Sequence, residues 1–519
     1  MNGGVGLSSA DMATLVDIPR YHVARTPDAT ALVHNGRETR YVDLDRLSNR
    51  VANGLAAFGI GAKSRVAILD KNSDLFFQIL FGAAKINAVL VPINARLAPP
   101  EILFALNDAQ AEVIFVGQPF VQVIEAICHQ LTSIRKVIVL ATDFAAWRDG
   151  QDATDPAVAV DIDDVVLQLY TSGTTGYPKG VQLTHRNFTS QATDECRAWS
   201  PDEVMLLTLP LFHIAGCGMG IHGLLSGLKI IIAREFVASE ILQMIERDRV
   251  TVAFLVPAML LALVAERRVE QHDLSSLKQI LYGASPIPLE LLKRALSVFK
   301  YSGFFQVYGL TETTGIITIL RSQDHFSART EIMKSCGRAV AGVEVRVIDD
   351  KGMPVAANRV GEIICRSSQN MKGYWRRPQD TAVTIRDQWL FTGDAGYLDD
   401  EGYLYIQDRI KDMIVSGGEN VYPAEIESAL FGHPDIADVA VIGVPDEKWG
   451  EAVKALLVLK EGRVADDAGI LQYARERLAG YKVPKTVEFV DELPRNPSGK
   501  ILKRALREQY WKGYDRRVN

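Results

Sequence analysis

Short apolar segments alternate with segments of helical pattern from residue 64 onward, and this alternation restricts the possible fold more than any other feature. The run "SRVAIL" at 64–69 is followed by a helical pattern, "SDLFFQILFGAAKI" at 73–86, and then by "AVLVPI" at 88–93. Ser73 stands where the N-cap of that helix is expected, because its hydroxyl can accept a hydrogen bond from a free backbone N–H. Strands that are apolar along their whole length are buried on both faces, so this order predicts a parallel sheet covered by helices.

The same alternation continues toward the middle of the chain. A helical pattern at 99–109 precedes the apolar run 111–116, and two further runs follow at 136–140 and 165–170. After about residue 340 the pattern changes to short alternating strands with Gly turns, for example "DAGYLDDEGYLYIQDR" at 394–409. Such alternation around Gly turns is typical of antiparallel hairpins.

The length of 519 residues exceeds what one hydrophobic core supports, so several domains are expected. We predict an α/β fold whose large N-terminal region, 1–407, consists of stacked α/β subdomains and a β-rich subdomain at about 340–407. A charged hinge at 408–411 would join this region to a small, mobile α+β domain at 412–519, in which "IADVAVIGVPD" at 436–446 is the clearest strand.

The charge and cysteine content exclude several classes of protein. The formal net charge is −6 and the sequence pI is about 5.9, which gives no general electrostatic attraction to nucleic acid. The 5 cysteines are scattered and form no closely spaced pair, so neither a zinc site nor a disulfide framework is predicted. A reducing compartment, the cytoplasm, is therefore expected.

No membrane-spanning or secretory segment is expected. The N-terminal residues lack the basic and long apolar parts of a signal peptide. Residues 204–228 carry no formally charged side chain, but they include Pro210, His213, His222 and several glycines. This content favours a buried segment of a large soluble fold over a membrane helix.

The segment "YTSGTTGYPKG" at 170–180 is rich in Gly, Ser and Thr and follows a predicted strand. Consecutive backbone N–H groups in such a loop form an anion-binding nest, to which hydroxyls and Lys179 add donors and charge, so phosphate is the expected guest. The spacing differs from that of the Walker A loop, because no Ser or Thr follows Lys179. By itself, such a loop is as compatible with a plain surface loop as with a phosphate site.

Six further motifs follow this loop in a fixed order, and together they decide between these two interpretations. They are "LPLFHIAG" at 209–216, "YGLTET" at 308–313, "GEI" at 361–363, "FTGD" at 391–394, "DRIKDMIVSGGENVYPAEIE" at 408–427 and "PRNPSGK" at 494–500. The sequence in this respect resembles the AMP-forming adenylate synthetases, which include acyl-CoA synthetases, amino-acid adenylation domains and beetle luciferases. The resemblance spans nearly the whole chain and is greatest to bacterial fatty-acyl-CoA synthetases and 4-coumarate–CoA ligases.

The resemblance implies that ATP and Mg²⁺ bind to this chain. Glu312 would hold Mg²⁺, Tyr308 would face adenine, Thr311 would touch the α-phosphate, and Asp394 would accept hydrogen bonds from the ribose hydroxyls. The full set implied for the nucleotide is Thr171, Ser172, Gly173, Thr174, Thr175, Gly176, Lys179, Gly283, Ala284, Ser285, Tyr308, Gly309, Thr311, Asp394, Arg409 and Lys500. Taken singly, such residues are also found as core tyrosines, turn aspartates and surface ion pairs.

The residues implied to be catalytic are Lys500, Glu312, Thr171 and His213. Lys500 would lie between the substrate carboxylate and the α-phosphate and cancel the repulsion between these two anions. A lysine near a C-terminus is otherwise most often a solvated charge, so its assignment depends on the motif.

The acyl group would bind among mostly small and apolar residues. The resemblance implies a pocket of His213, Ala215, Gly216, Met219, Val256 and Val307. A neutral imidazole at 213 cannot neutralise the ammonium group of an amino acid. The pocket is expected among residues 213–219, 254–259, 282–284 and 307, which include no arginine for a second carboxylate. A fatty or aryl monocarboxylic acid is therefore the expected substrate, although His213 also fits a buried core histidine.

Residues near the C-terminus are implied to bind CoA and to allow domain movement. The residues implied for CoA are Gly417, Gly418, Glu419, Tyr481 and Lys482, and Lys411 would be the hinge residue. We expect free CoA as acceptor, since no carrier domain follows Lys500.

The predicted function is that of an ATP-dependent carboxylate–CoA ligase that releases AMP and pyrophosphate. A luciferase-like adenylating oxygenase and a catalytically silent nucleotide-binding protein are the alternatives. The expected partners are a carboxylic acid and CoA, with no nucleic acid and no transmembrane segment. Peripheral membrane contact, a homodimer and acetylation of Lys500 by a lysine acetyltransferase remain open expectations.

Overall fold

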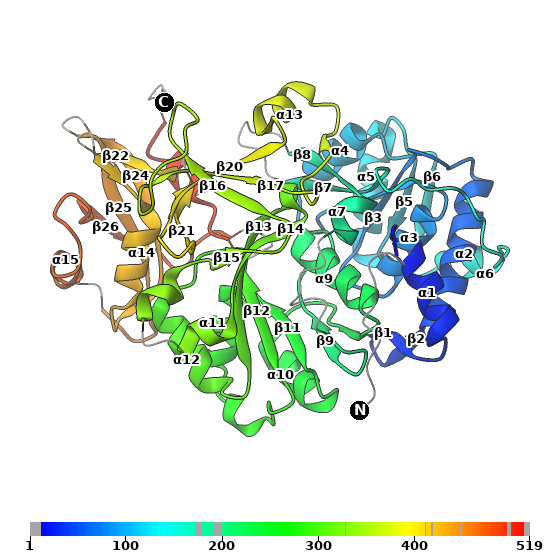
Figure 1. Cartoon of the computed structure of the whole chain (residues 1–519), viewed down its shortest axis with the longest axis horizontal. Coiled ribbons are helices and arrows are strands. Elements are labelled where there is room, and N and C mark those ends of the chain that lie inside the picture. Colours follow the sequence, from blue (N-terminus) through cyan, green and yellow to red (C-terminus); the bar gives the residue numbers. More distant parts are fainter. Residues whose placement is uncertain are drawn as a thin grey trace.

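The computed structural model describes residues 12–171, 178–190, 199–326, 329–409, 412–416, 419–446, 449–464, 466–495 and 500–512. Within these residues the strands form four sheets, and the sheet of the C-terminal part lies at one side of the molecule (Figure 1). The mixed α/β architecture predicted from the sequence is confirmed. No helix of the described ranges is both long enough and apolar enough to cross a membrane.

The first large sheet has seven described strands. In spatial order they are β18 (Gly373–Tyr374), β8 (Lys179–Thr184), β7 (Val165–Thr171), β4 (Val89–Pro92), β3 (Arg65–Leu69), β5 (Val113–Val116) and β6 (Lys136–Val139). Every residue of β3, β4 and β5 is buried, as expected for strands covered on both faces. The strands from β7 to β6 run parallel, whereas β8 and β18 add an antiparallel edge.

The second large sheet has nine described strands. Their order is β15 (Arg338–Ala339), β14 (Gly315–Leu320), β13 (Gly303–Leu310), β12 (Gln279–Gly283), β11 (Val252–Leu255), β9 (Val204–Leu207), β10 (Lys229–Ile232), β1 (Thr30–His34) and β2 (Arg37–Arg40). It too has a parallel centre, flanked by antiparallel strands at both edges. The parallel sheet predicted from residues 64–170 is the first large sheet, in which β3, β4, β5, β6 and β7 run parallel, so that prediction is confirmed.

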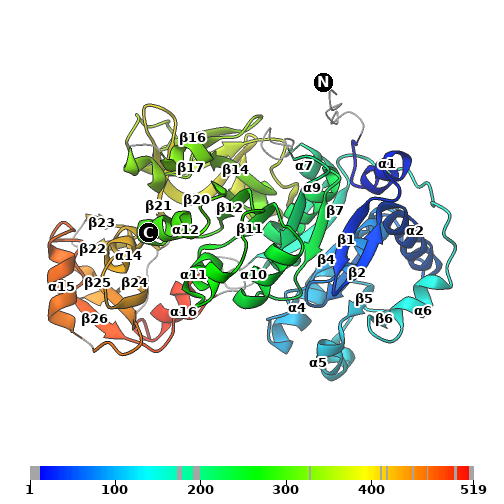
Figure 2. The same ribbon diagram turned by 90° about the horizontal axis from the view of Figure 1, so that it is seen from below.

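Two smaller sheets complete the fold. The β-rich part contains β16 (Glu344–Ile348), β17 (Gly361–Arg366), β19 (Ile385–Arg386), β20 (Trp389–Leu398) and β21 (Leu404–Arg409). The C-terminal part contains β22 (Ile414–Ser416), β23 (Glu419–Val421), β24 (Ile436–Asp446), β25 (Gly450–Leu459) and β26 (Thr486–Phe489). Figure 2 shows this last sheet and its helices grouped at one end of the molecule.

Helices cover both faces of the large sheets. The described α-helices are α1 (Asp17–Arg25), α2 (Tyr41–Ala57), α3 (Leu75–Ala84), α4 (Pro99–Ala109), α5 (Val121–Ile127), α6 (Phe144–Asp149), α7 (His185–Thr189), α9 (Ile214–Leu225), α10 (Ala238–Arg247), α11 (Pro257–Ala265), α12 (Leu289–Val298), α13 (Pro378–Thr384), α14 (Pro423–Phe431), α15 (Asp467–Arg475) and α16 (Lys503–Glu508). Side chains of α3 and α9 belong to one continuous hydrophobic core that also includes residues of both large sheets. The two sheets are therefore joined through this core.

The helix predicted after residue 73 begins differently from the prediction. α3 starts at Leu75, its N-cap residue is Asp74, and no side chain caps it. The amides of Phe76 and Phe77 instead donate to the carbonyls of Ser73 and Asp74, at 3.3 and 3.2 Å. The prediction that Ser73 is the N-cap is therefore wrong, because a tight backbone turn already satisfies these amides.

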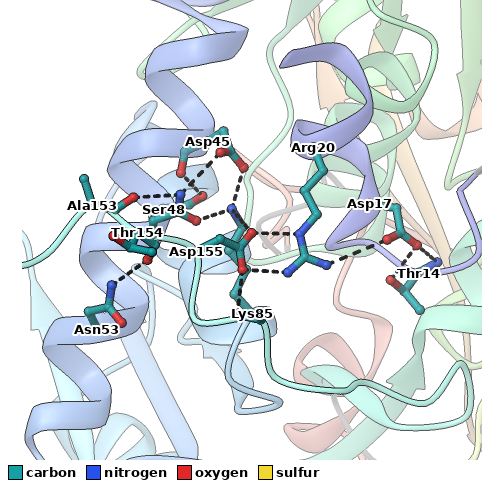
Figure 3. A network of polar contacts seen from close by, with 12 residues as sticks. Thr14, Asp17, Arg20, Asp45, Ser48, Asn53, Lys85, Ala153, Thr154 and Asp155 are labelled. Carbon is teal, nitrogen blue, oxygen red and sulfur yellow. Dashed lines mark hydrogen bonds and ion pairs between the residues drawn. The ribbon is translucent and has the colours of Figure 1, made fainter. Parts of the chain in front are cut away.

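A buried lysine ties the N-terminal helices to the chain that leads into β7 (Figure 3). Lys85 has no exposed side-chain surface, and its ammonium group lies 2.5 Å from Asp45 of α2 and 3.6 Å from Asp155. Asp155 also accepts a hydrogen bond of 2.7 Å from Arg20 of α1. Because a buried charge is tolerated only when it is paired, this network fixes four segments against one another: α1, α2, the end of α3 and the chain before β7.

Candidate active site

Tyr308, Asp394 and Arg409 meet where the second large sheet adjoins the β-rich sheet. The Tyr308 hydroxyl donates to Asp394 Oδ2 at 2.6 Å, and Arg409 Nε lies 2.7 Å from Asp394 Oδ1. Asp394 and Arg409 are directly opposite each other on β20 and β21. Burial, together with the charge of Asp394, raises the pKa of Tyr308 well above its usual value, so its hydroxyl stays a donor.

The turn before Asp394 explains why this carboxylate points into the site. Gly393 has a φ of +69°, a backbone conformation that residues with a side chain rarely adopt. Its amide donates to Glu362 Oε1 at 3.2 Å. The Thr392 hydroxyl donates to the carbonyl of Ile363 at 2.7 Å. The "GEI" and "FTGD" motifs thus interlock, and Asp394 is only 4% exposed.

Glu312 lies in a short 3₁₀ turn, η5 (Thr311–Thr313), that directly follows β13. The turn is closed by Leu310, whose amide donates to Thr313 Oγ1 at 2.9 Å. Gly309 must be glycine, because a Cβ there would lie 1.6 Å from the carbonyl oxygen of Gly315. The tight turn therefore presents the half-buried Glu312 side chain beside the edge of the first large sheet.

One oxygen of the Glu312 carboxylate is held by a tyrosine. The Tyr374 hydroxyl donates to Glu312 Oε1 at 2.9 Å, and among the described residues no hydrogen bond to Glu312 Oε2 is present. The described residues contain no cluster of three or more His, Cys, Asp or Glu side chains that could hold a metal alone. A single carboxylate with a free oxygen fits Mg²⁺ as it binds with nucleotide phosphates, since this ion keeps several water and phosphate ligands.

Lys179 and Thr171 are brought together by the hairpin of β7 and β8. They are cross-strand partners, and the Lys179 ammonium lies 2.7 Å from Asp380 Oδ1 and 5.0 Å from the centre of the Tyr374 ring. The residues between these two positions that were predicted to contact phosphates lie outside the described part of the chain: Ser172, Gly173, Thr174, Thr175 and Gly176.

The small residues at 283–285 lie at the end of β12. A Cβ on Gly283 would lie 2.1 Å from the Val307 carbonyl oxygen, so glycine is required for the close approach of β12 to β13. Ala284 has a φ of +66° and is exposed, while Ser285 is half-buried. A left-handed alanine is strained, and such strain is commonly found at ligand-binding sites.

Lys500 lies near the nucleotide residues although it belongs to the C-terminal part of the chain. Burial and the positive charge of Arg409 lower its pKa, while Asp394, Asp412 and Asp408 act in the opposite direction. A charge effect of this kind requires proximity. The charges of Arg409 and Asp394 therefore both act on the Lys500 ammonium group.

The helix that follows Lys500 is anchored beside the predicted hinge. Lys503 Nζ lies 2.8 Å from Glu427 Oε1 and 3.6 Å from Asp408 Oδ2. Arg507 donates to Asp412 Oδ1 at 2.9 Å. These contacts fix α16 against both flanks of the hinge, while Lys411 itself lies outside the described residues.

Four of the predicted acyl residues, His213, Ala215, Gly216 and Met219, lie at the N-cap of α9 or in its first half. His213 is the N-cap of this helix, with Nδ1 accepting from the Ala215 amide at 3.3 Å, and burial lowers the pKa of His213 to about 4. Met219, Val256 and Val307 are buried in one core, against which Ala215 packs. Gly216 instead packs against the backbone of Pro210, since a Cβ on Gly216 would lie 2.1 Å from the Pro210 carbonyl oxygen.

The residues predicted to bind CoA are only partly described. Glu419 is exposed on β23, Tyr481 is 42% exposed, and Lys482 donates to both carboxylate oxygens of Glu425 at 2.7 Å. Gly417 and Gly418 lie outside the described residues. The Lys482 charge is thus paired within the C-terminal part of the chain.

Sequence reasoning missed Tyr374 and Asp380, which contact Glu312 and Lys179. Tyr374 belongs to a strand of two residues, too short to give a recognisable alternation, and Asp380 lies in the short helix α13. The only signal in the sequence is the cluster "GYWRRP" at 373–378, and it carries no indication of either partner.

Comparisons with known proteins agree with this arrangement. Residues 20–375 match the family model described as "AMP-binding enzyme", and residues 425–500 match "AMP-binding enzyme C-terminal domain". The chain is 39% identical to the fatty acid–acyl-carrier-protein ligase ScoC of Streptomyces coeruleorubidus, over 99% of each chain. It is 40% identical to the long-chain-fatty-acid–CoA ligase FadD13 of Mycobacterium tuberculosis, over 95% of this chain and 97% of that protein. The solved structure of the anthranilate CoA ligase AuaEII with anthranoyl-AMP is 30% identical and superposes with a TM-score of 0.90, covering 97% of this chain and 99% of that one.

Proposed function

Because this chain belongs to the AMP-binding enzyme family, we propose that the site around Tyr308, Asp394, Arg409 and Lys500 activates a carboxylic acid as its adenylate. The chain is an ATP-dependent acid–CoA ligase. In the first step a carboxylate oxygen attacks the α-phosphorus of ATP, the bond to the β-phosphate breaks, and pyrophosphate leaves. In the second step the CoA sulfur attacks the acyl carbon, the bond to the phosphate oxygen breaks, and AMP leaves.

The observation that carries this assignment is the buried contact of Asp394 with Tyr308 and Arg409, and the charges of Asp394 and Arg409 also act on Lys500. Asp394 accepts hydrogen bonds from the ribose hydroxyls, and its remaining lone pairs hold Tyr308 and Arg409 in place. The Lys500 ammonium cancels repulsion between the two anions as they approach, which a preorganised cation does without reorganising solvent.

The phosphates face the other end of the site. Lys179 supplies a positive charge, and Thr171 and the residues 172–176 supply hydroxyl and amide donors. Glu312, whose Oε1 accepts a hydrogen bond from Tyr374, would hold Mg²⁺. When bound, Mg²⁺ neutralises charge on the leaving pyrophosphate.

A fatty or aryl monocarboxylic acid is the proposed substrate class. His213 is neutral at physiological pH because burial lowers its pKa to about 4, so it offers no charge to a second carboxylate. The remaining proposed lining residues, Ala215, Met219, Val256 and Val307, are apolar. FadD13 is named for long-chain fatty acids and AuaEII for anthranilate, and both substrate types fit an apolar pocket.

We propose that the two half-reactions use two orientations of the domain 412–519 relative to the region 1–407. Lys500 serves adenylation, and Gly417, Gly418, Glu419, Tyr481 and Lys482 serve thioester formation after rotation about 408–411. Lys411→Pro should then slow thioester formation far more than adenylation, because a hinge residue absorbs the backbone change.

A panel of fatty and aryl acids, assayed for AMP release with and without CoA, tests the proposed function. Release that depends on both acid and CoA, with the acyl-CoA detected by mass spectrometry, is the expected result. Light emission without CoA would indicate a luciferase-like oxygenase, and nucleotide binding without AMP release would indicate a silent binding protein.

A carrier-protein thiol is the second candidate acceptor. The 39% identity to ScoC, a fatty acid–acyl-carrier-protein ligase, favours this candidate. Parallel reactions with CoA and with a phosphopantetheinylated carrier protein separate the two acceptors. We expect faster turnover with CoA, and the reverse order would transfer the assignment to the carrier protein.

Three further properties, besides a cytoplasmic location, belong to the proposal. Lys500 is a target for a lysine acetyltransferase, because acetylation would remove the charge that adenylation needs. A substrate with a long acyl chain would bring the enzyme into peripheral contact with membranes in the cytoplasm. A homodimer is the proposed oligomer, which analytical ultracentrifugation tests.

A further inference from the structure

Residues 371–380 lie against both phosphate-facing charges of the site. The Met371 amide donates to the Glu312 carbonyl at 2.8 Å, and the Trp375 amide donates to the Gly180 carbonyl at 2.7 Å. Between them, Tyr374 pairs with Val181 of β8 in the two-residue strand β18. This segment therefore connects the turn of Glu312 to the strand that begins with Lys179.

The side chain of Tyr374 contacts both Glu312 and Lys179. Its hydroxyl donates to Glu312 Oε1 at 2.9 Å, and its ring centre lies 5.0 Å from Lys179 Nζ. Its own position is fixed, because its amide donates to Thr381 Oγ1 at 2.9 Å. A protonated tyrosine donates one hydrogen bond, so it selects one carboxylate oxygen and leaves the other available.

We propose that Tyr374 is a positioning residue, whose hydroxyl orients the Glu312 carboxylate for the metal ion and whose ring holds the Lys179 ammonium beside it. This inference rests on the proposed function, in which Glu312 holds Mg²⁺ and Lys179 binds phosphate. A hydrogen bond to an ionised carboxylate is stronger than a neutral one and directional, so it restricts the rotation of that carboxylate. The electron-rich face of the ring attracts the ammonium group and keeps it from turning into solvent.

Lys179 is held by an ion pair with Asp380 as well as by the Tyr374 ring. Lys179 Nζ lies 2.7 Å from Asp380 Oδ1, on the same short segment as Tyr374. Tyr374 and Asp380 together hold the Lys179 ammonium group, and the ring contact is the weaker of the two and occupies none of the three hydrogen-bond donors of that group.

Two substitutions separate the functions of the hydroxyl and the ring. Tyr374→Phe removes only the hydroxyl, and Tyr374→Leu removes the ring as well. Tyr403→Phe is a matched control, since it deletes a hydroxyl that donates to Asp324 at 3.1 Å outside this site. Glu312→Gln tests the metal assignment itself.

The first measurement is the affinity for Mn²⁺ in the presence of α,β-methylene-ATP, detected by electron paramagnetic resonance. We expect Tyr374→Phe to weaken Mn²⁺ binding by about 10- to 100-fold, the usual effect of losing an outer partner of a metal ligand. Pyrophosphate release should then need more Mg²⁺ but recover at saturating Mg²⁺. Tyr374→Leu should in addition raise the KM for ATP at saturating Mg²⁺, and Tyr403→Phe should change neither quantity.

The outcomes distinguish this inference from the proposed function. Unchanged Mn²⁺ binding in Tyr374→Phe, together with weakened binding in Glu312→Gln, would overturn the positioning role alone. Unchanged binding in both variants would overturn the placement of the metal at Glu312. A lower adenylation rate at saturating Mg²⁺ with unchanged metal affinity would also overturn the inference, because it would indicate a role in the chemical step rather than in metal binding.

Discussion

Replacing Asp394 by asparagine should remove most of the affinity for AMP while leaving the fold intact. The carboxylate is 4% exposed and already holds Tyr308 at 2.6 Å and Arg409 at 2.7 Å. Its two oxygens offer about four acceptor positions in all, so two remain for the ribose hydroxyls. Asparagine keeps the shape but replaces one oxygen by a donor group and removes the charge that Arg409 faces.

The magnitude follows from the number of hydrogen bonds lost. Each hydrogen bond to a charged group contributes about 1.5–3 kcal/mol, so losing two at the lower value costs about 3 kcal/mol, or roughly 150-fold in Kd. Isothermal titration of AMP into both proteins measures this ratio, and circular dichroism checks that the variant is folded. Tyr308→Phe, which keeps the carboxylate, should weaken AMP binding much less. A change below about threefold in a folded Asp394→Asn protein would refute the reasoning.

Three other predictions concern stability, pH and substrate size. Burial lowers the pKa of His185, His213 and His222 to about 4, so the unfolded chain binds up to three more protons than the folded chain between pH 6.5 and 4. The free energy of unfolding should be highest above pH 6.5 and fall on acidification by up to about 4 kcal/mol per pH unit. Urea unfolding at pH 7, 6 and 5 measures this, and an unchanged free energy of unfolding would contradict the prediction. Lys85→Met should destabilise the chain by about 3 kcal/mol, because it leaves Asp45 and Asp155 without their buried partner; a urea midpoint like that of the wild type would be the contrary result. Ala215→Trp should exclude bulky acids and spare short ones in the AMP-release panel, since added volume in a packed pocket is sterically selective; an unchanged substrate profile would place the pocket elsewhere.

The sequence was most informative where one local rule determined the structure. The helix predicted at 99–109 is α4 (Pro99–Ala109), because two prolines begin it and the apolar spacing continues to its end. The strand predicted at 436–446 is β24 (Ile436–Asp446), since residues 439–443 are all buried and alternate between two cores of the C-terminal part. In both cases the signal lies within the segment itself.

Features that depend on distant partners could not be predicted in this way. Ser73 is a good N-cap residue by type, but the backbone carbonyls of Ser73 and Asp74 satisfy the first turn of α3. Tyr374 contacts Glu312 across 62 positions of sequence and Lys179 across the sheet edge. The left-handed backbone of Ala284 follows no residue preference, because alanine disfavours it.

The candidate site shows the same division. Motif order predicted Tyr308, Asp394 and Arg409 as nucleotide residues, and the structure brings these three together. It did not predict that Asp394 would hold both other side chains directly, because that contact depends on the register of β20 and β21. The interlocking of Glu362 with Gly393 likewise requires the paired strands β17 and β20.

The measurement that tests the account most directly is a comparison of the two half-reactions in Lys500→Ala. Pyrophosphate release from ATP and acid should fall by about 10²- to 10³-fold, because a preorganised cation is lost where carboxylate and phosphate meet. Chemically prepared acyl-adenylate with CoA should still yield acyl-CoA at nearly the wild-type rate, since that step does not use Lys500. Normal pyrophosphate release by the variant would contradict the role of Lys500 and, with it, the proposed site.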